Sequence, residues 1–310
     1  MRQTRYDYTS IFYNGFAAVR LGKKWNYIDE QGKLLSDTWF DYCGHFRKEF
    51  ARVKLDNKWN FIDEQGNPIC DQWFDCCYSC NKGLGVVKLD DKCNYINKQG
   101  KYLSDQWFDE CWEFHEEVAR VRLNNKYNCI DKQGRLLSDT WFDWCRVFQW
   151  YATVRLNNKW NFIDKQGKLL GETWFDECWE FHEGFAKVEL KGKWNYIDEQ
   201  GNLLGETWFD DGSEFHKGIA TVKLKHKWNF INKQGKLLND QWFDICFGFK
   251  EGFAKVRLNG KYNLIDYHGY LLSDTWFESC SSFHNSIANI LINSQCKLIN
   301  IKGEIINETN

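Results

Sequence analysis

Apolar and polar residues alternate in short runs along this chain. In the stretch 186–190, alanine, valine and leucine alternate with charged residues, which is the period of a half-buried strand. Lys191 and Gly192 separate this run from 193–198, which is rich in aromatic and β-branched residues and reads as a second strand. Other copies carry Asn or Gly at the same place, and both tolerate positive φ. The spacing therefore predicts a two-residue hairpin turn.

The pattern continues beyond the second strand. Asp198 suits the first position of a type I turn, and Gly201 suits the left-handed residue that ends it. We expect a third strand to begin at 203–204, and the segment 207–210 to open a connector that could form a fourth short strand. The runs between turn signals have five to eight residues, which is too short for typical helices. The pattern predicts an all-β fold.

The same motif recurs nine times. Its centres are spaced by 34 residues, except for 33 residues in one interval, and they are Trp25, Trp59, Cys93, Tyr127, Trp160, Trp194, Trp228, Tyr262 and Cys296. Glycine fills one position of all nine copies and isoleucine fills another. We predict a single domain over residues 1–310, made of three-stranded β-meander units at approximately 6–39, 40–73, 74–107, 108–141, 142–174, 175–208, 209–242, 243–276 and 277–310.

The small apolar face of one unit requires stacking on its neighbours. Two architectures satisfy this, an open solenoid or superhelix and a closed β-propeller-like ring. Propeller blades usually need about 40 residues or more, and rings usually have about four to eight blades. Arg5 and Asn310 stand at the two ends where other units have tryptophan, which fits open, capped ends. We expect the open solenoid and keep the ring as the alternative.

Charge and hydropathy remove several classes of function. Lys and Arg number 41 against 43 Asp and Glu, a formal net charge of -2, so bulk charge gives no reason to expect nucleic acid as a partner. No apolar run approaches the roughly 18 residues of a membrane-spanning helix. The first residues lack the apolar region of a signal peptide. We therefore expect neither membrane insertion nor standard secretion.

The 13 cysteines favour a core role over chemistry. Seven share one column: Cys43, Cys77, Cys111, Cys145, Cys178, Cys246 and Cys280. One small apolar residue per unit indicates buried, reduced thiols and hence a cytoplasmic location, with export by a route without a signal peptide left open. The densest cluster, Cys76, Cys77 and Cys80, lacks a fourth ligand, so no metal and no other cofactor is expected.

A carboxylate follows Trp-Phe in eight units: Asp41, Asp75, Asp109, Asp143, Asp176, Asp210, Asp244 and Glu278. Glycoside hydrolysis needs two carboxylates in one cleft, whereas this column has one per unit. We expect these side chains to cap the backbone of the connector turn. The sequence contains no catalytic motif such as GxSxG, a P-loop, GxGxxG or HExxH, so we expect no enzyme.

Two sets of residues are candidates for binding. The outward position between Val and Leu of the first strand carries a basic row, interrupted by Glu189: Arg20, Lys54, Lys88, Arg122, Arg155, Lys223 and Arg257. This row suits an acidic partner, although it could also be a solvated face that blunts strand edges. Trp112, Trp144 and Trp179 lie in or beside the connectors, where they could serve as aromatic subsites for a sugar.

The complete unit reads F-x-x-G-[FI]-A-x-V-x-L-x-x-K-W-N-[FY]-I-D-x-Q-G-K-L-L, followed by W-F-D. This resembles the WG (KWG) repeat family over essentially the whole chain. The glycine that follows tryptophan in that family is asparagine here: Asn26, Asn60, Asn94, Asn128, Asn161, Asn195, Asn229 and Asn263, with Lys297 last. Asparagine replaces glycine best at a left-handed position or a bulge, so we expect one there.

The resemblance implies a repeat module of bacterial type, used for binding or interaction, and it supplies no catalytic residue. We therefore expect a non-catalytic scaffold that binds a protein partner through an extended surface. The alternative is a ligand- or glycan-binding, lectin-like module built on the tryptophans.

Overall fold

The computed structural model describes residues 6–46, 50–81, 83–148 and 150–306, with the backbone alone for 79–81. Within these ranges the chain contains no helix, and so no helix that could cross a membrane. Arg5 and Asn310, the polar residues at the two ends, lie outside the described residues. Each sheet falls within one of the nine predicted 34-residue units, which are called repeats 1 to 9 from here on.

The nine antiparallel sheets are β1 (Tyr8–Thr9), β2 (Phe16–Leu21) and β3 (Lys24–Asp29); β4 (Tyr42–Cys43), β5 (Phe50–Leu55) and β6 (Lys58–Asp63); β7 (Cys76–Asn81), β8 (Leu84–Leu89) and β9 (Lys92–Asn97); β10 (Glu110–Cys111), β11 (Val118–Leu123) and β12 (Lys126–Asp131); β13 (Trp144–Val147), β14 (Tyr151–Leu156) and β15 (Lys159–Asp164); β16 (Glu177–His182), β17 (Phe185–Leu190) and β18 (Lys193–Asp198); β19 (Asp211–Gly212), β20 (Ile219–Leu224) and β21 (Lys227–Asn232); β22 (Ile245–Lys250), β23 (Phe253–Leu258) and β24 (Lys261–Asp266); and β25 (Ser279–Cys280), β26 (Ile287–Ile292), β27 (Gln295–Asn300) and β28 (Ile305–Ile306).

The two long strands of each repeat form the predicted hairpin. In repeat 6, β17 pairs with β18 from Phe185 opposite Asp198 to Leu190 opposite Lys193. Lys191 and Gly192 have φ of 53° and 74°, the positive values of a two-residue hairpin turn. The Oδ1 atom of Asp198 then accepts the N–H groups of residues 200 and 202, which closes the second turn. Both turns that the sequence predicts are confirmed.

The third strand differs from the prediction. Leu203 makes only an isolated bridge to Ile197, and Phe209 makes another to Trp194. The chain leaves the ladder between these bridges, because the Asn195 side chain binds the Gly205 carbonyl. The third strand of each sheet comes instead from the residues that follow Trp-Phe, as in β19, which pairs with β20 of the next repeat. Each sheet thus has a connector edge, formed by this first short strand, and a turn edge, formed by the segment after the glycine turn.

Sheets stack face to face, and both faces of an inner sheet are buried. Tyr196 of β18 packs in one cluster with Ala220 and Val222 of β20 and Ile231 of β21. Phe230, on the opposite face of β21 from Ile231, packs in turn against Ala254 and other residues of repeat 8. A single apolar face per unit was too conservative an expectation, since each repeat is covered from both sides.

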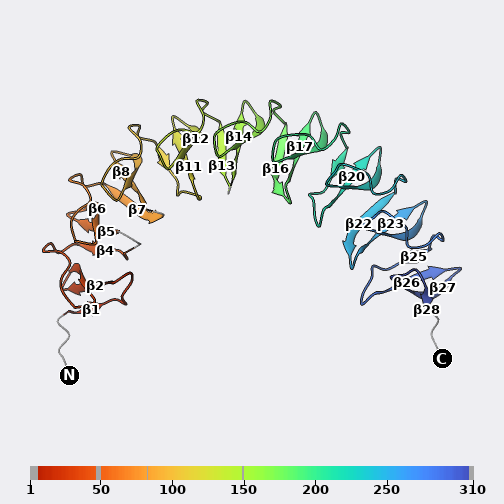
Figure 1. Ribbon diagram of the computed structural model, residues 1–310, viewed down its shortest axis with the longest axis horizontal. Helices are drawn as coiled ribbons and strands as arrows, with labels where there is room; N and C mark the ends of the chain where they lie inside the picture. Colours follow the sequence, from red (N-terminus) through yellow and green to blue (C-terminus); the bar gives the residue numbers. More distant parts are fainter. Residues whose placement is uncertain (1–5, 47–49, 82, 149, 307–310) are drawn as a thin grey trace, which may run out of the picture. The chain divides into compact units, whose positions relative to one another are not determined.

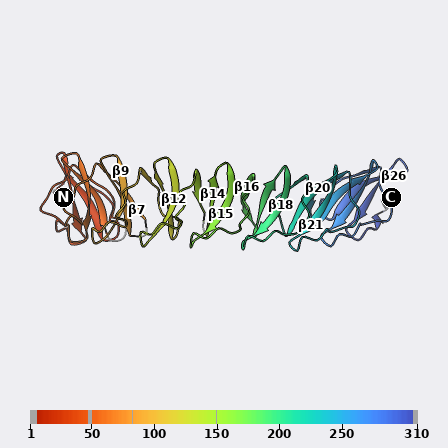
Figure 2. The same cartoon turned by 90° about the horizontal axis from the view of Figure 1, so that it is seen from above.

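The chain divides into two compact units, residues 1–158 with 162–169, and residues 159–161 with 170–310. In each unit the sheets follow one another in chain order (Figures 1 and 2). None of the nine sheets closes into a barrel, which is consistent with an open, solenoid-like tandem repeat. The all-β class of three-stranded meanders is therefore confirmed, and the single continuous domain stays a prediction.

The glycine column closes the turn edge against the preceding repeat. Gly201 has φ of 83°, and a Cβ atom added to it would lie 1.5 Å from the carbonyl oxygen of Leu170. Six further glycines of the column would meet the corresponding carbonyl oxygen at less than 3.0 Å. Glycine recurs here because both the left-handed backbone and the close approach exclude a side chain.

The asparagine column does not mark a left-handed residue or a bulge, which corrects the sequence interpretation. Asn195 lies in the middle of β18, opposite Val188, and is 1% exposed. Its Nδ2 atom donates to the Gly205 carbonyl at 2.8 Å, and its Oδ1 atom accepts the Tyr196 N–H at 2.7 Å. In six other repeats the same amide donates to two carbonyls of the turn edge. The side chain replaces missing ladder bonds, which buried carbonyls require.

Candidate interaction surface

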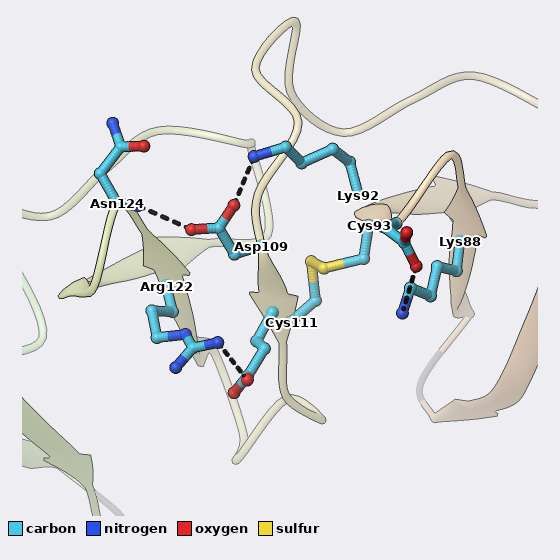
Figure 3. A network of polar contacts seen from close by, with 9 residues as sticks. Lys88, Lys92, Cys93, Asp109, Cys111, Arg122 and Asn124 are labelled. Atoms are coloured by element: carbon cyan, nitrogen blue, oxygen red, sulfur yellow. Dashed lines mark hydrogen bonds and ion pairs between the residues drawn. A yellow bond between two sulfur atoms is a disulfide. The ribbon is translucent and has the colours of Figure 1, made fainter.

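The carboxylate column joins consecutive repeats. Asp109 accepts a hydrogen bond from the Lys92 ammonium of the preceding repeat and another, at 2.7 Å, from the backbone N–H of Asn124 in the hairpin turn of its own repeat (Figure 3). The lysine–aspartate contact recurs as Lys24–Asp41, Lys58–Asp75, Lys126–Asp143, Lys159–Asp176, Lys193–Asp210 and Lys227–Asp244. The column caps the hairpin turn and not the connector turn, so its expected local role holds at a different place.

These contacts set the protonation of the carboxylates. The hydrogen bond from Lys193 is the main reason why the pKa of Asp210 is lowered, and the backbone N–H of Lys225 adds to it. The pKa values of the other six aspartates of the ladder are lowered by the corresponding lysines. All seven carboxylates are thus committed to structural contacts.

The basic row lies half-buried against its own sheets. Each cation stands directly opposite the aromatic column of the second strand, as Arg20 does opposite Trp25. The charged atoms therefore lie 5.3–5.8 Å from ring centroids in four pairs: Arg20–Trp25, Lys54–Trp59, Lys223–Trp228 and Arg257–Tyr262. Arg122 instead forms an ion pair of 2.5 Å with Glu110, and Lys88 forms one of 3.5 Å with Asp91 (Figure 3). Arg155 donates to Asn158. Binding by this row stays a prediction.

A second column of cations was missed by the sequence interpretation. It lies between Ala and Val of the first strand and alternates along the chain, with Arg52, Arg120, Lys187 and Lys255 in repeats 2, 4, 6 and 8, and Val86, Thr153 and Thr221 in repeats 3, 5 and 7. This position shares its face with the basic row, two residues away, and the alternation itself was the available signal.

Each cation of this column lies between two aromatic rings. The Lys187 ammonium is 5.0 Å from the Trp179 centroid on the connector strand and 3.8 Å from the Trp194 centroid on β18. Arg120 is likewise 3.8 Å from Trp112 and 5.5 Å from Tyr127. Arg52 lies between Tyr42 and Trp59, and Lys255 between Phe247 and Tyr262. We call each group a cation–aromatic cluster; a cation within about 6 Å of a ring is attracted by its quadrupole.

The three predicted tryptophans fall into two places. Trp112 and Trp179 occupy equivalent positions, one residue after the cysteine column, and each contacts the cation of its cluster. Trp179 is 47% exposed, whereas Trp112 is half-buried under Arg120. Trp144 lies two residues earlier in its repeat, on β13 opposite Arg155, and is half-buried. The structure therefore does not bring it into an equivalent cluster.

A pocket of about 620 Å³ adjoins Trp112. It is formed by the connectors of repeats 4 and 5 and lined by Trp112, Glu113, His115, Glu116, Arg120, Arg146, Val147 and Phe148. The walls combine aromatic surface with both signs of charge, so the pocket can contact a polar ligand through one ring and several charged groups.

Three connectors form long edge strands. β7, β16 and β22 have six residues each, and among the described strands each pairs with a single neighbour. In each, one extra residue interrupts the register, as between Cys178 and Phe181 of β16. Such bulges redirect side chains. The aromatic residue at this point is exposed in all three: Tyr78 by 48%, Trp179 by 47% and Phe247 by 38%.

The cysteines correct one expectation. Cys93 of repeat 3 and Cys111 of repeat 4 form a disulfide with a Cα–Cα distance of 6.0 Å (Figure 3), so not all thiols are free. Cys93 takes the place of tryptophan in its column, and that position contacts the cysteine column of the next repeat. A cysteine in the tryptophan column was therefore the missed signal. Side-chain placement of Cys80 is outside the described part, and the cytoplasmic location stays a prediction.

The comparisons with known proteins follow the repeats. The sequence profile of the WG containing repeat matches residues 3–25, 27–59, 95–127, 162–194 and 230–262, together half of the chain. No curated protein matches the chain.

Solved structures resemble the chain only weakly. AztD from Citrobacter koseri is 10% identical with a TM-score of 0.31, and the match covers 83% of this chain and 93% of that one. Hsv2 of Kluyveromyces lactis is 10% identical with a TM-score of 0.30, over 78% of this chain and 89% of that one. Such low scores support no argument about the function or the architecture of this protein. The family profile, in register with the repeated sheets, shows that this chain belongs to the WG repeat family.

Proposed function

We propose that this protein is a non-catalytic repeat scaffold that binds an extended segment of a protein partner along its connector edge. The observation that carries the proposal is the exposed aromatic residue on each long edge strand, above all Trp179 on β16 and Phe247 on β22. Edge strands offer backbone groups to a further strand, and alternate side chains give such pairing its specificity.

The details of β22 favour a selective edge over a general one. A bulge between Cys246 and Phe249 interrupts the register, and bulges limit uncontrolled pairing of strand edges. Phe247 lies 4.3 Å from the Lys255 ammonium, measured to the ring centroid, so the exposed ring is held by a cation from the neighbouring strand. A fixed aromatic group contributes contact area at low cost in conformational entropy, as at binding hot spots.

The test uses affinity capture from source-cell lysate followed by binding of the purified partner. The baits are the intact chain, a Trp179→Ser/Phe247→Ser variant and a matched Tyr270→Ser control, which changes an exposed aromatic residue at a glycine turn. We expect the purified partner to bind the intact chain and the control, and to bind the double variant at least 10-fold more weakly. A partner that loses the same affinity for the control and for the double variant would contradict the connector edge as the binding site.

The pocket beside Trp112 supports a second candidate function, glycan binding. Arg120 covers one side of the Trp112 ring at 3.8 Å, while the ring and charged residues border about 620 Å³. A glycan array with the intact chain and Trp112→Ala separates the candidates. Binding of a defined glycan that Trp112→Ala abolishes, with no protein partner recovered, would favour the lectin-like function over the scaffold.

A further inference from the structure

Two thiols of neighbouring repeats meet in the core of the first compact unit. Cys129 lies on β12 of repeat 4, Cys145 lies on β13 of repeat 5, and both are 0% exposed. Their Sγ atoms are 3.0 Å apart. A disulfide bond requires about 2.05 Å, so closure needs a movement of about 1 Å between two side chains that already point toward each other.

This pairing occurs once because two columns coincide there. Cys145 belongs to the cysteine column, and Cys129 is the one cysteine in a column that otherwise reads Tyr27, Phe61, Tyr95, Phe162, Tyr196, Phe230, Leu264 and Leu298. Elsewhere a cysteine of the first column packs near an aromatic ring, as Cys77 does in one cluster with Phe61. The disulfide of Cys93 with Cys111 follows the same rule one repeat earlier, since an aromatic position that faces the next repeat carries cysteine.

We propose that Cys129 and Cys145 are a second disulfide site, closed by hydrogen peroxide. The sulfur of one cysteine attacks a peroxide oxygen, the O–O bond breaks, and a sulfenic acid and one water result. The second sulfur then attacks the sulfenic sulfur, the S–S bond forms and the S–O bond breaks, which releases a second water. The two thiols lose two hydrogens and two electrons, and one peroxide is reduced to two waters.

The surroundings make this a slow reaction of a small oxidant. The contact with Cys145, followed by burial, raises the pKa of the Cys129 thiol, so little reactive thiolate is present at neutral pH. Full burial excludes large oxidants such as protein disulfides. Peroxide is small enough to reach such a site through local opening of the structure.

Closure would join three repeats covalently beneath the pocket. Cys93–Cys111 links repeats 3 and 4, and Cys129–Cys145 would link repeats 4 and 5. Trp112 and Arg146, which follow Cys111 and Cys145 in the sequence, both line the pocket. Arg120 also donates to the Cys145 carbonyl at 2.8 Å. The second bond would therefore fix both walls of the pocket to one covalent frame.

The experiment is a peptide map of the full chain. The folded protein is treated with dithiothreitol or with hydrogen peroxide, then denatured, alkylated with iodoacetamide and digested with trypsin without reduction. Peptides 127–132 and 136–146 contain Cys129 and Cys145, and peptides 93–98 and 102–120 contain the other pair. We expect a 127–132/136–146 linked peptide, two hydrogens lighter than its parts, to rise at least 10-fold with peroxide.

Two variants make the map specific. Cys145→Ser should remove this linked peptide and leave Cys129 fully alkylated. The control Cys178→Ser changes the same column one repeat later and should leave it intact. The proposal is overturned if peroxide-treated wild-type protein yields both peptides fully alkylated while the 93–98/102–120 pair is recovered. It is equally overturned if Cys129 is linked to a cysteine other than Cys145.

Discussion

The turn edge and the connector edge of the same sheet differ in how much they vary from repeat to repeat. At the turn edge, every repeat has the glycine, and all but the last have the buried asparagine. At the connector edge, the first strand has two, four or six residues, and the cation of the cluster alternates with neutral residues. The constant edge carries the contacts that stack the sheets, so the other edge is free to differ. Function is therefore expected where the repeats disagree.

The largest effect should come from the glycine column. Gly201→Ala places a methyl group 1.5 Å from a carbonyl of the preceding repeat, and Gly192→Ala, also at positive φ, meets no atom within 4 Å. We expect Gly192→Ala to cost about 1–2 kcal/mol of unfolding free energy and Gly201→Ala about 3 kcal/mol or more, measured by urea denaturation. Equal losses would show that φ alone selects glycine and that contact with the preceding repeat does not.

The asparagine column should follow. Asn195→Ala removes one bond to the Gly205 carbonyl and one to the Tyr196 N–H, both buried, so we expect a loss of about 2–4 kcal/mol. Asn202→Ala, an exposed control whose side chain contacts Asp198, should change stability by less than about 0.5 kcal/mol. Asn195→Gly restores the residue typical of the family. Wild-type stability for that variant would mean that the bare backbone satisfies the same carbonyl without the amide.

The connector edge should tolerate change better. Trp179→Ser removes an exposed ring and one of two rings around Lys187, so we expect a loss of about 1 kcal/mol, of the size of one cation–π contact. Thermal unfolding compared with Asn195→Ala tests this order. A loss for Trp179→Ser as large as that for Asn195→Ala would remove the distinction between a structural edge and a variable edge.

The lysine–aspartate ladder should have the smallest effect on stability. The Lys193 ammonium lowers the pKa of Asp210 in the folded state, so this contact stabilises the fold above the unfolded pKa near 3.9 and loses that effect as pH falls through the lower, folded pKa. Lys193→Ala should raise the pKa of Asp210 toward its ordinary value, as followed by carboxyl NMR titration. An unchanged titration would mean that the backbone N–H of Lys225 holds the carboxylate alone.

The sequence predicts most of the fold because each repeat states the same local rules nine times. The hairpin turn at Lys191 and Gly192 and the turn closed by Asp198 both follow from residue type and spacing. The third strand was wrong, because Asn195 binds a carbonyl across the sheet, and no periodicity reports a side chain that replaces a ladder bond. The left-handed role given to that asparagine failed for the same reason.

The candidate site was less accessible from the sequence. Trp112 and Trp179 were found from their irregular positions, but Arg120 and Lys187 were passed over as ordinary outward residues of a strand. Their role depends on which rings lie above and below them. The disulfide partner of Cys93 also depends on contact between repeats, and spacing within one repeat does not contain that distance.

The ladder also has a consequence for how such a chain changes length. Lys193 binds Asp210, and Lys227 binds Asp244, so each repeat presents the same donor forward and the same acceptor backward. Excision of residues 209–242 would bring Lys193 to Asp244 with every column still in phase. Whole blocks of 34 residues can thus be gained or lost by recombination with each new junction already complementary, whereas a deletion of any other size leaves mismatched partners at the seam.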